Sequence, residues 1–272
     1  MHNGCILCGG TGSGKSITGL AYYFIRNGGT VEPMTKMVNP KDLYIITTAK
    51  KRDSGEWIGD MSWFHLTPDD ETKIYDHKVV IDSWNNIKKY ADVKNSFFIF
   101  DEQRVVGYGA WTKAFLKIAK SNEWILLSVT PGDNFMDYMP VFIANGFYKN
   151  KSEFTAEHCV YSRFSKFPQI ERIIGTERLN RLRRRVLVDM PYQNPAVQHH
   201  EDVWCSFDKE AYKNLMKDRW DYEKNEPIEN ISELCYKLRK ICYADESRAE
   251  ALRNIFEEHN KLIVFYNFDY EL

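Results

Sequence analysis

Residues 9–16 have the types and spacing needed to bind the phosphates of a nucleotide. The segment follows the pattern G-x-x-x-x-G-K-[ST] and consists of Gly9, Gly10, Thr11, Gly12, Ser13, Gly14, Lys15 and Ser16. The glycines allow backbone N–H groups to turn toward an anion, and a helix that begins here directs its positive end at the same point. Lys15 is expected to reach the β- and γ-phosphates, and the Ser16 hydroxyl is expected to bind Mg²⁺. The predicted ligands are therefore ATP and Mg²⁺.

The alternative for this segment is a glycine-rich turn that binds nothing. The flanking residues argue against it, because the apolar run Gly4–Cys8 predicts a strand before the loop. Lys15–Arg26 predicts a helix after it, ended by Asn27-Gly28-Gly29. A strand, a glycine-rich loop and a helix in this order form the context that phosphate binding requires.

Two acidic residues form the second half of the predicted site. The apolar strand Phe97–Phe100 leads directly into Asp101 and Glu102. Mg²⁺ keeps most of its waters and takes one carboxylate, a role that suits Asp101. Glu102 is expected to orient or deprotonate the attacking water, so Lys15 and Glu102 are the predicted catalytic residues. An ordinary acidic junction is the alternative, and the phosphate loop makes it less favoured. We expect Asp101 and Lys15 at the ends of neighbouring strands.

Short apolar strands that alternate with helical stretches must position these groups. Besides the two strands above, strands are expected at Leu43–Thr48, Lys78–Asp82 and Trp124–Ser128. The pattern predicts an α/β fold, a P-loop RecA-like parallel sheet with helices on both faces, followed by a partial second domain. In such sheets, ligands bind at the carboxyl ends of the strands. The expected domains are residues 1–150 (ATP-binding), 151–195 (a basic helical linker or insert) and 196–272 (an incomplete second domain).

The composition is that of an ordinary globular protein. The 272 residues are 43% hydrophobic and 28% charged, and the formal net charge is -1. A nucleic-acid partner would therefore need a local basic patch. Neither an apolar run of about 18 residues nor a secretory signal is present, so no membrane contact and a cytoplasmic location are expected. Cys5 and Cys8 form a C-x-x-C pair, which we interpret as packing in a strand rather than as a zinc site.

The order of the motifs resembles that of superfamily 2 helicases. Motifs I, Ia, II and III of that family correspond here to Gly9–Ser16, Thr47-Thr48-Ala49-Lys50-Lys51, Asp101-Glu102-Gln103-Arg104 and Ser128-Val129-Thr130. Later segments resemble the Swi/Snf-type branch, namely Leu238-Arg239-Lys240-Ile241-Cys242 and the strand-like motif IV at Leu262–Phe268. The sequence as a whole, including Leu127–Asn134, is similar to helicases encoded by phages of Gram-positive bacteria.

The resemblance implies a DNA-dependent motor, with RNA as a less favoured substrate. Thr48 and Lys50 would lie near the nucleic-acid backbone, and Ser128 and Thr130 would couple the state of the γ-phosphate to domain movement. For these residues, a solvated charged loop and a plain strand-end turn are the alternatives. The arginine-rich stretch 178–185 could likewise contact phosphates or form a solvated helix face.

The sequence also departs from the family pattern. Motifs V and VI, with their arginine finger, would follow motif IV, and the chain ends at Leu272. We therefore expect a fragment or a truncated reading frame that binds Mg-ATP weakly, hydrolyses it slowly and depends on a missing helicase half or on other replication proteins. Two other functions stay open. One is a non-motor P-loop partner of a replication or recombination complex, and the other is a small-molecule kinase with Arg181–Arg185 as its lid.

Overall fold

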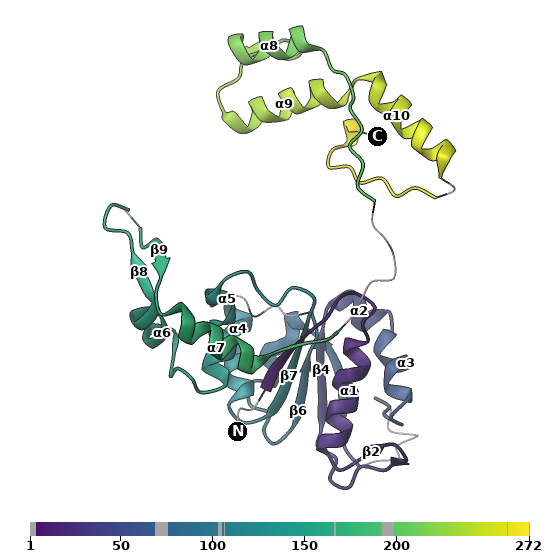
Figure 1. The fold of residues 1–272 in the computed structure, drawn as a ribbon, viewed down its shortest axis with the longest axis vertical. Coiled ribbons are helices and arrows are strands. Elements are labelled where there is room, and N and C mark those ends of the chain that lie inside the picture. Colours follow the sequence, from purple (N-terminus) through teal and green to yellow (C-terminus); the bar gives the residue numbers. More distant parts are fainter. Residues whose placement is uncertain are drawn as a thin grey trace. The chain divides into compact units, whose positions relative to one another are not determined.

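The computed structural model describes residues 4–68, 76–102, 105, 107–165, 167–191, 199–259 and 261–271. The chain divides into two compact units, Met1–Asn194 and Pro195–Leu272 (Figure 1). None of the described helices is both long enough and apolar enough to cross a membrane.

The first unit is built on a six-stranded sheet with the strand order β10-β1-β7-β6-β4-β5. All five strand pairings in this sheet are parallel. The strands are β1 (Gly4–Cys8), β4 (Leu43–Thr47), β5 (Val79–Ser83), β6 (Phe97–Phe100), β7 (Glu123–Ser128) and β10 (Leu187–Asp189). The predicted strands of the ATP-binding domain are therefore present, with bounds that differ by a residue or so.

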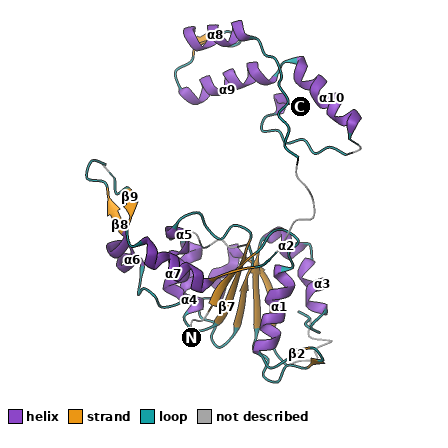
Figure 2. Ribbon diagram, viewed as in Figure 1, coloured by secondary structure: helices purple, strands orange, loops and turns teal. Residues whose placement is uncertain are grey.

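Helices cover both faces of this sheet (Figure 2). On one face α1 (Lys15–Arg26) and α3 (Glu56–Ser62) pack on a core that includes Phe97 and Ile99. On the other face α4 (Ala110–Ala119), α5 (Phe135–Ala144) and α7 (Thr176–Val186) pack on a core that includes Phe98 and Phe100. Successive residues of β6 thus point to opposite faces, as a strand buried on both sides requires. The predicted α/β class is confirmed.

Shorter elements complete the first unit. They are the hairpin β2 (Thr30–Val31) and β3 (Met34–Thr35), helix α2 (Ala49–Asp53), the 3₁₀ helix η2 (Trp84–Tyr90), helix α6 (Lys151–His158), and the hairpin β8 (Cys159–Tyr161) and β9 (Ile170–Ile173). The segment η2 winds as a 3₁₀ helix, which is tighter than an α-helix.

The described part of residues 151–191, expected to be a basic helical linker or insert, belongs to the first compact unit. Helices α6 and α7 and strand β10 belong to the first compact unit. In α7 the side chains of Leu179, Leu182 and Val186 are buried, and β10 then pairs with β1. The apolar stripe of α7 has ordinary helical spacing, but the many arginines around it make it hard to recognise in the sequence. The expected boundary at Tyr192–Pro195 falls among residues 192–198, outside the described part of the chain.

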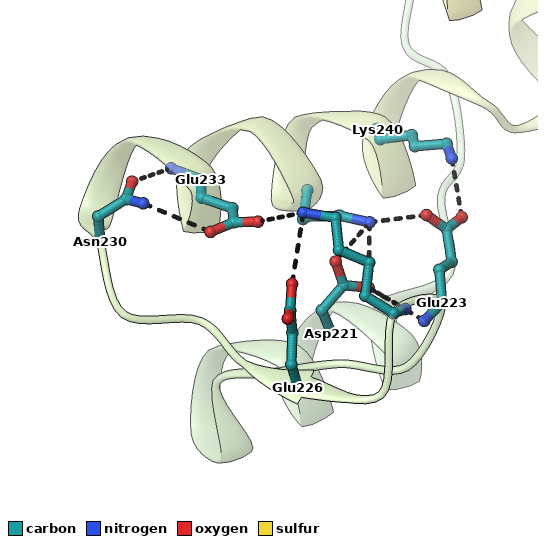
Figure 3. Close-up of polar contacts among 8 residues, drawn as sticks. Asp221, Glu223, Glu226, Asn230, Glu233 and Lys240 are labelled. Atoms are coloured by element: carbon teal, nitrogen blue, oxygen red, sulfur yellow. Dashed lines mark hydrogen bonds and ion pairs between the residues drawn. The ribbon is translucent and has the colours of Figure 1, made fainter.

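The second unit consists of small helices and a short hairpin. Its elements are α8 (Lys209–Asp218), β11 (Trp220–Asp221), β12 (Glu226–Pro227), α9 (Ile231–Tyr243), α10 (Glu246–Glu258) and the 3₁₀ helix η3 (Asp269–Glu271). Lys237 of α9 lies 2.9 Å from Asp221 and 2.6 Å from Glu223, and Lys240 lies 2.8 Å from Glu223. These ion pairs join the hairpin to α9 (Figure 3). The small apolar core comprises Leu215, Ile228, Leu234 and Leu238.

The strand expected at Leu262–Phe268 is not found. Residues 261–268 form neither helix nor strand, and Ile263 and Phe265 are exposed. A strand needs a neighbour with which its backbone groups can pair. Among residues 199–259 and 261–271, only the two-residue strands β11 and β12 form a sheet. An apolar, β-branched sequence without a sheet to join therefore remains irregular.

Candidate nucleotide-binding site

The loop between β1 and α1 has the conformation that its glycines allow. Gly12 and Gly14 have φ angles of 79° and 80°, in the left-handed region that other residues avoid. Gly14 is the N-cap of α1 and has no side chain to cover the first N–H groups of the helix. At Gly9, a Cβ atom would lie 2.5 Å from Oγ of Ser13. The loop is therefore compact, and its helix end is open to an anion.

Lys15 folds back over this loop. Its Nζ atom donates hydrogen bonds of 2.8 Å to the carbonyl oxygens of Gly9 and Gly10. These bonds hold the ammonium group above the loop, on the side of the cavity that Lys15 lines. A phosphate bound at the end of α1 would meet this charge directly.

Asp101 is fixed at the carboxyl end of β6 by its main chain and its side chain. Its N–H donates to the carbonyl of Ile46 at 2.8 Å, and its own carbonyl accepts from Nε1 of Trp84 at 2.8 Å. The carboxylate accepts a 2.8 Å hydrogen bond from the hydroxyl of Thr47 and forms a 2.8 Å ion pair with Lys51. Asp101 is 1% exposed, so its negative charge requires such partners.

Glu102 adopts an unusual backbone conformation. Its φ angle is 54°, which is uncommon for a residue other than glycine and turns the chain sharply after Asp101. The turn brings Glu102 to the wall of the cavity that Lys15 and Ser16 also line. Strained backbone of this kind is concentrated at functional sites. Gln103 and Arg104, the rest of the predicted motif, lie outside the described residues.

The strand order differs from our expectation for Asp101 and Lys15. Lys15 follows β1 and Asp101 follows β6. Strand β7 lies between β1 and β6, so these two strands are not adjacent. Ser128 ends the intervening strand β7 and is paired with Cys8 of β1. Its carbonyl oxygen accepts a 3.2 Å hydrogen bond from the N–H of Gly9. Sequence order alone does not determine which parallel strands are neighbours.

The two residues predicted to couple nucleotide state to movement occupy different positions. Ser128 is buried beside the phosphate loop, whereas Thr130 is exposed. They are linked, because the N–H of Thr130 donates a 3.1 Å hydrogen bond to Oγ of Ser128. Ser128 is thus in direct contact with the loop, and Thr130 is connected to it through Ser128.

The oxygens predicted to bind Mg²⁺ converge on one point. Nζ of Lys51 lies 2.8 Å from Oδ2 of Asp101 and 3.5 Å from Oγ of Ser16. Both oxygens therefore face a position that a positive charge can occupy, and both are hard ligands of the kind that Mg²⁺ prefers. Among the described residues, no group of three or more His, Cys, Asp or Glu side chains gathers as a metal site. A Mg²⁺ ion here would take Asp101, Ser16, water and nucleotide oxygens.

A cavity of about 570 Å³ opens beside these residues. Besides the phosphate loop and Glu102, residues of α2 and α3 line it, including Lys51, Glu56 and Asp60. Burial raises the pKa of Asp60, and the negative charges of Glu56 and Asp101 raise it further, while Lys51 lowers it. Glu56 and Asp60 were not among the site residues predicted from the sequence. Their i, i+4 spacing places them on one helix face, a signal that was available.

Thr48 and Lys50 line the same cavity, although the resemblance placed them near nucleic acid. Thr48 is the N-cap of α2, and its hydroxyl accepts a 3.2 Å hydrogen bond from the N–H of Lys51. This bond gives Thr48 a structural role in orienting α2. In the structure, both residues therefore lie beside the candidate nucleotide site.

The arginines of α7 are divided between packing and exposure. Arg178, Arg183 and Arg185 stack over aromatic rings of the first unit, at 5.3, 5.9 and 5.3 Å from the ring centroids. Arg178 also forms an ion pair with Glu157. Such contacts attach the helix to the unit. Of the five arginines in α7, Arg183 is half-buried and the other four are exposed.

Cys5 and Cys8 lie in β1 as expected, and both thiols are free. Burial raises the pKa of Cys5 to about 11, and burial together with Asp189 raises that of Cys8. The interpretation of this pair as strand packing is consistent with these surroundings.

Comparison with known proteins yields similarity to solved structures alone. Neither a protein-family model nor a curated protein matches the chain. A SWI2/SNF2 ATPase core from Sulfolobus solfataricus, solved in complex with dsDNA, is 16% identical over 94% of this chain and 60% of that chain, with a TM-score of 0.49. The helicase domain of Hef from Pyrococcus furiosus is 18% identical over 59% and 38%, with a TM-score of 0.36. The chain thus spans less than two thirds of either protein, and likeness at these levels concerns the fold alone.

Proposed function

We propose that this chain is the nucleotide-binding part of an ATP-dependent DNA translocase or helicase of superfamily 2. The observation that carries the proposal is the meeting of four groups at one sheet edge. Lys15, Ser16 and Glu102 come from two separate strand ends and line one cavity. The buried Asp101 carboxylate adjoins this cavity through its ion pair with Lys51, which lines it as well. This combination suits the binding and hydrolysis of Mg-ATP.

Each group has a separate task in the proposed reaction. The N–H groups of the loop and the end of α1 bind the phosphates, and Lys15 neutralises charge on the β- and γ-oxygens. Ser16 and Asp101 would hold Mg²⁺, which would draw charge from the phosphate oxygens. Glu102 would orient a water toward the γ-phosphate and take up its proton.

The link to movement is proposed through β7. Ser128 contacts the phosphate loop through the N–H of Gly9, and Thr130 is bonded to Ser128. A change of conformation at the γ-phosphate would therefore be passed from the phosphate loop through Ser128 to Thr130 at the surface. DNA as the partner rests on the resemblance in motif order, and Thr48 and Lys50 would then contact it from the cavity rim. A second RecA-like half would be the partner that closes over the nucleotide.

The small-molecule kinase is less compatible with these contacts. It requires Arg181–Arg185 to act as a mobile lid over the phosphates. Arg183 and Arg185 instead stack on Tyr138 and Phe147 within the first unit. A non-motor ATP-binding partner would use the same nucleotide site, so the response to DNA separates it from the motor.

Steady-state ATP turnover with and without DNA tests the proposal. Single-stranded DNA, duplex DNA and RNA should be compared, with Lys15→Ala as the control that removes the phosphate-binding ammonium. Turnover that DNA stimulates and that Lys15→Ala abolishes would support the motor. Turnover indifferent to any nucleic acid would favour the non-motor partner. Unchanged ATP affinity in Lys15→Ala would contradict the site itself.

A further inference from the structure

Lys51 places its ammonium group at the position where the candidate metal ligands converge. Its Nζ atom lies 2.8 Å from Oδ2 of Asp101 and 3.5 Å from Oγ of Ser16. These are the two protein oxygens proposed to hold Mg²⁺. The ammonium group of Lys51 therefore faces the same two oxygens that a Mg²⁺ ion would need.

Several contacts hold Lys51 in this position. The helix α2 that carries it begins at Thr48, whose hydroxyl accepts from the N–H of Lys51 at 3.2 Å. The next residue, Arg52, lies 3.3 Å from the carboxylate of Asp82 at the end of β5. The ammonium also lies 5.3 Å from the ring centroid of Trp57. Contacts of both the backbone and the side chain of Lys51 therefore fix its position.

The surroundings make this ion pair a strong one. The side chains of Asp101 and Lys51 are 2% and 22% exposed. A carboxylate so deeply buried is destabilised when it loses its cationic partner, because little water can replace it. We therefore expect a cation beside Asp101 both before and after nucleotide binds.

We propose that Lys51 is a built-in counter-ion, which occupies the cation position in the nucleotide-free protein and is displaced by Mg²⁺. The inference rests on the proposed function, because it concerns the same site. Lys51 is then a positioning residue that keeps Asp101 oriented and sets the Mg²⁺ concentration that nucleotide binding requires. Two cations cannot share one carboxylate oxygen at these distances without strong repulsion.

The cavity offers the displaced ammonium another place. Glu56 and Asp60 of α3 line the same cavity as Lys51 and provide two carboxylates on one helix face. A lysine side chain has four methylene groups and can turn between acceptors without movement of its helix. Binding of Mg²⁺ would thereby transfer the lysine charge toward α3, while Asp101 keeps a cationic partner throughout.

A Mg²⁺ titration tests the exchange directly. A fluorescent ADP analogue is bound at a fixed concentration, and the half-saturating Mg²⁺ concentration is measured for the wild type, Lys51→Met and Lys50→Met. Lys51→Met should need on the order of tenfold less Mg²⁺, which corresponds to about 1.4 kcal/mol of competing interaction. Lys50→Met removes the same charge from the same helix and should shift the concentration far less. An unchanged or higher requirement in Lys51→Met, or equal shifts in both variants, would overturn the proposal.

Thermal unfolding without nucleotide provides an independent measurement. In EDTA, Lys51→Met should melt at a lower temperature than the wild type, because Asp101 has lost its counter-ion. Mg²⁺ alone should then raise the melting temperature of Lys51→Met more than that of the wild type. Adding Asp101→Asn should remove the deficit of Lys51→Met in EDTA, since the buried charge is then absent. Equal melting temperatures in EDTA would overturn the counter-ion role.

The two measurements also separate this inference from the proposed function. If neither protein binds the ADP analogue, the nucleotide site is contradicted, and the unfolding experiment still decides whether Lys51 balances Asp101. If both proteins bind the analogue and Mg²⁺ dependence is the same, the nucleotide site stands and the role of Lys51 fails.

Discussion

The hydroxyl group of Thr47 donates a hydrogen bond of 2.8 Å to Oδ2 of Asp101, and both residues are buried. Thr47 ends β4 and Asp101 follows β6, and these strands are direct neighbours in the sheet. The bond therefore joins two strand ends at the candidate metal position. It fixes one oxygen of the carboxylate before any ligand is present, which reduces the reorganisation needed when a ligand binds.

Thr47→Val should destabilise the first unit by about 2 kcal/mol, because it removes a hydrogen bond to a buried charged group without changing the side-chain shape. Mg²⁺-dependent nucleotide binding should weaken as well, since Asp101 becomes free to turn. Thr47→Ser keeps the hydroxyl, so it should retain the Mg²⁺ dependence and lose only the packing of one buried methyl group. Urea unfolding and the Mg²⁺ titration measure the two effects. Equal Mg²⁺ dependence in Val and Ser variants would show that the bond does not orient Asp101.

Glu102→Gln should bind Mg-ATP with nearly normal affinity and hydrolyse it at least about a hundredfold more slowly, the usual worth of a general base. The amide has the shape of the carboxylate but cannot accept the proton of the attacking water. Binding is followed with a fluorescent ATP analogue, and turnover by phosphate release. Normal turnover in this variant would mean that another group activates the water.

Gly4→Ala should destabilise the first unit by about 1–3 kcal/mol through overpacking. A Cβ atom at Gly4 would lie 2.4 Å from the ring of Trp124. Trp124 is directly opposite Gly4 on the neighbouring strand β7. Gly59→Ala is the matched control, because the new methyl group on helix α3 would meet no atom within 4 Å. It should stabilise the helix by about 0.5–1 kcal/mol. Chemical unfolding of both variants checks the opposite signs.

Asp82 should make the stability of the first unit depend on acid pH. Burial raises its pKa, but hydrogen bonds from Asn86, Tyr90, Ser83 and Arg52 outweigh burial and hold the pKa below its ordinary value. A lowered folded-state pKa contributes stability above the unfolded value of about 3.9, and this contribution is lost as the pH falls through the folded value.

The advantage of the wild type over Asp82→Asn should therefore be full near neutral pH and should shrink below about pH 4. Thermal unfolding across this range measures it. Asp92→Asn is the control, since the Asp92 side chain is 93% exposed in its 3.3 Å ion pair with Lys117 and should show little effect at any pH. A constant difference between wild type and Asp82→Asn would contradict the assignment.

The central strands and the first helix could be predicted because their signals are local. Strands such as Phe97–Phe100 are short apolar runs between polar residues, and Lys15–Arg26 has a glycine start and a glycine stop. The edge strand β10 was missed because its three residues follow an arginine-rich helix. Helix α5 was missed although Asn134 and Asp137 form a capping box, a signal masked by Pro140 inside the helix.

The candidate site was predictable where one motif carries several groups. Lys15, Ser16 and Glu102 were predicted, and the structure brings them to one cavity. The order of β1, β7 and β6 was not, since parallel strands can be arranged in several ways for one sequence. The position of Lys51 opposite Asp101 depends on contacts between α2, β4 and β6, which only the folded chain establishes.

Met190 connects strand β10 to the phosphate loop. Its N–H donates a 2.7 Å hydrogen bond to the carbonyl of Cys8, and its sulfur lies 3.9 Å from Oγ of Ser13. It directly follows β10, whose pairing with β1 is parallel. A displacement of β10 would therefore be transmitted to Cys8 and Ser13, on either side of Gly9 in the sequence.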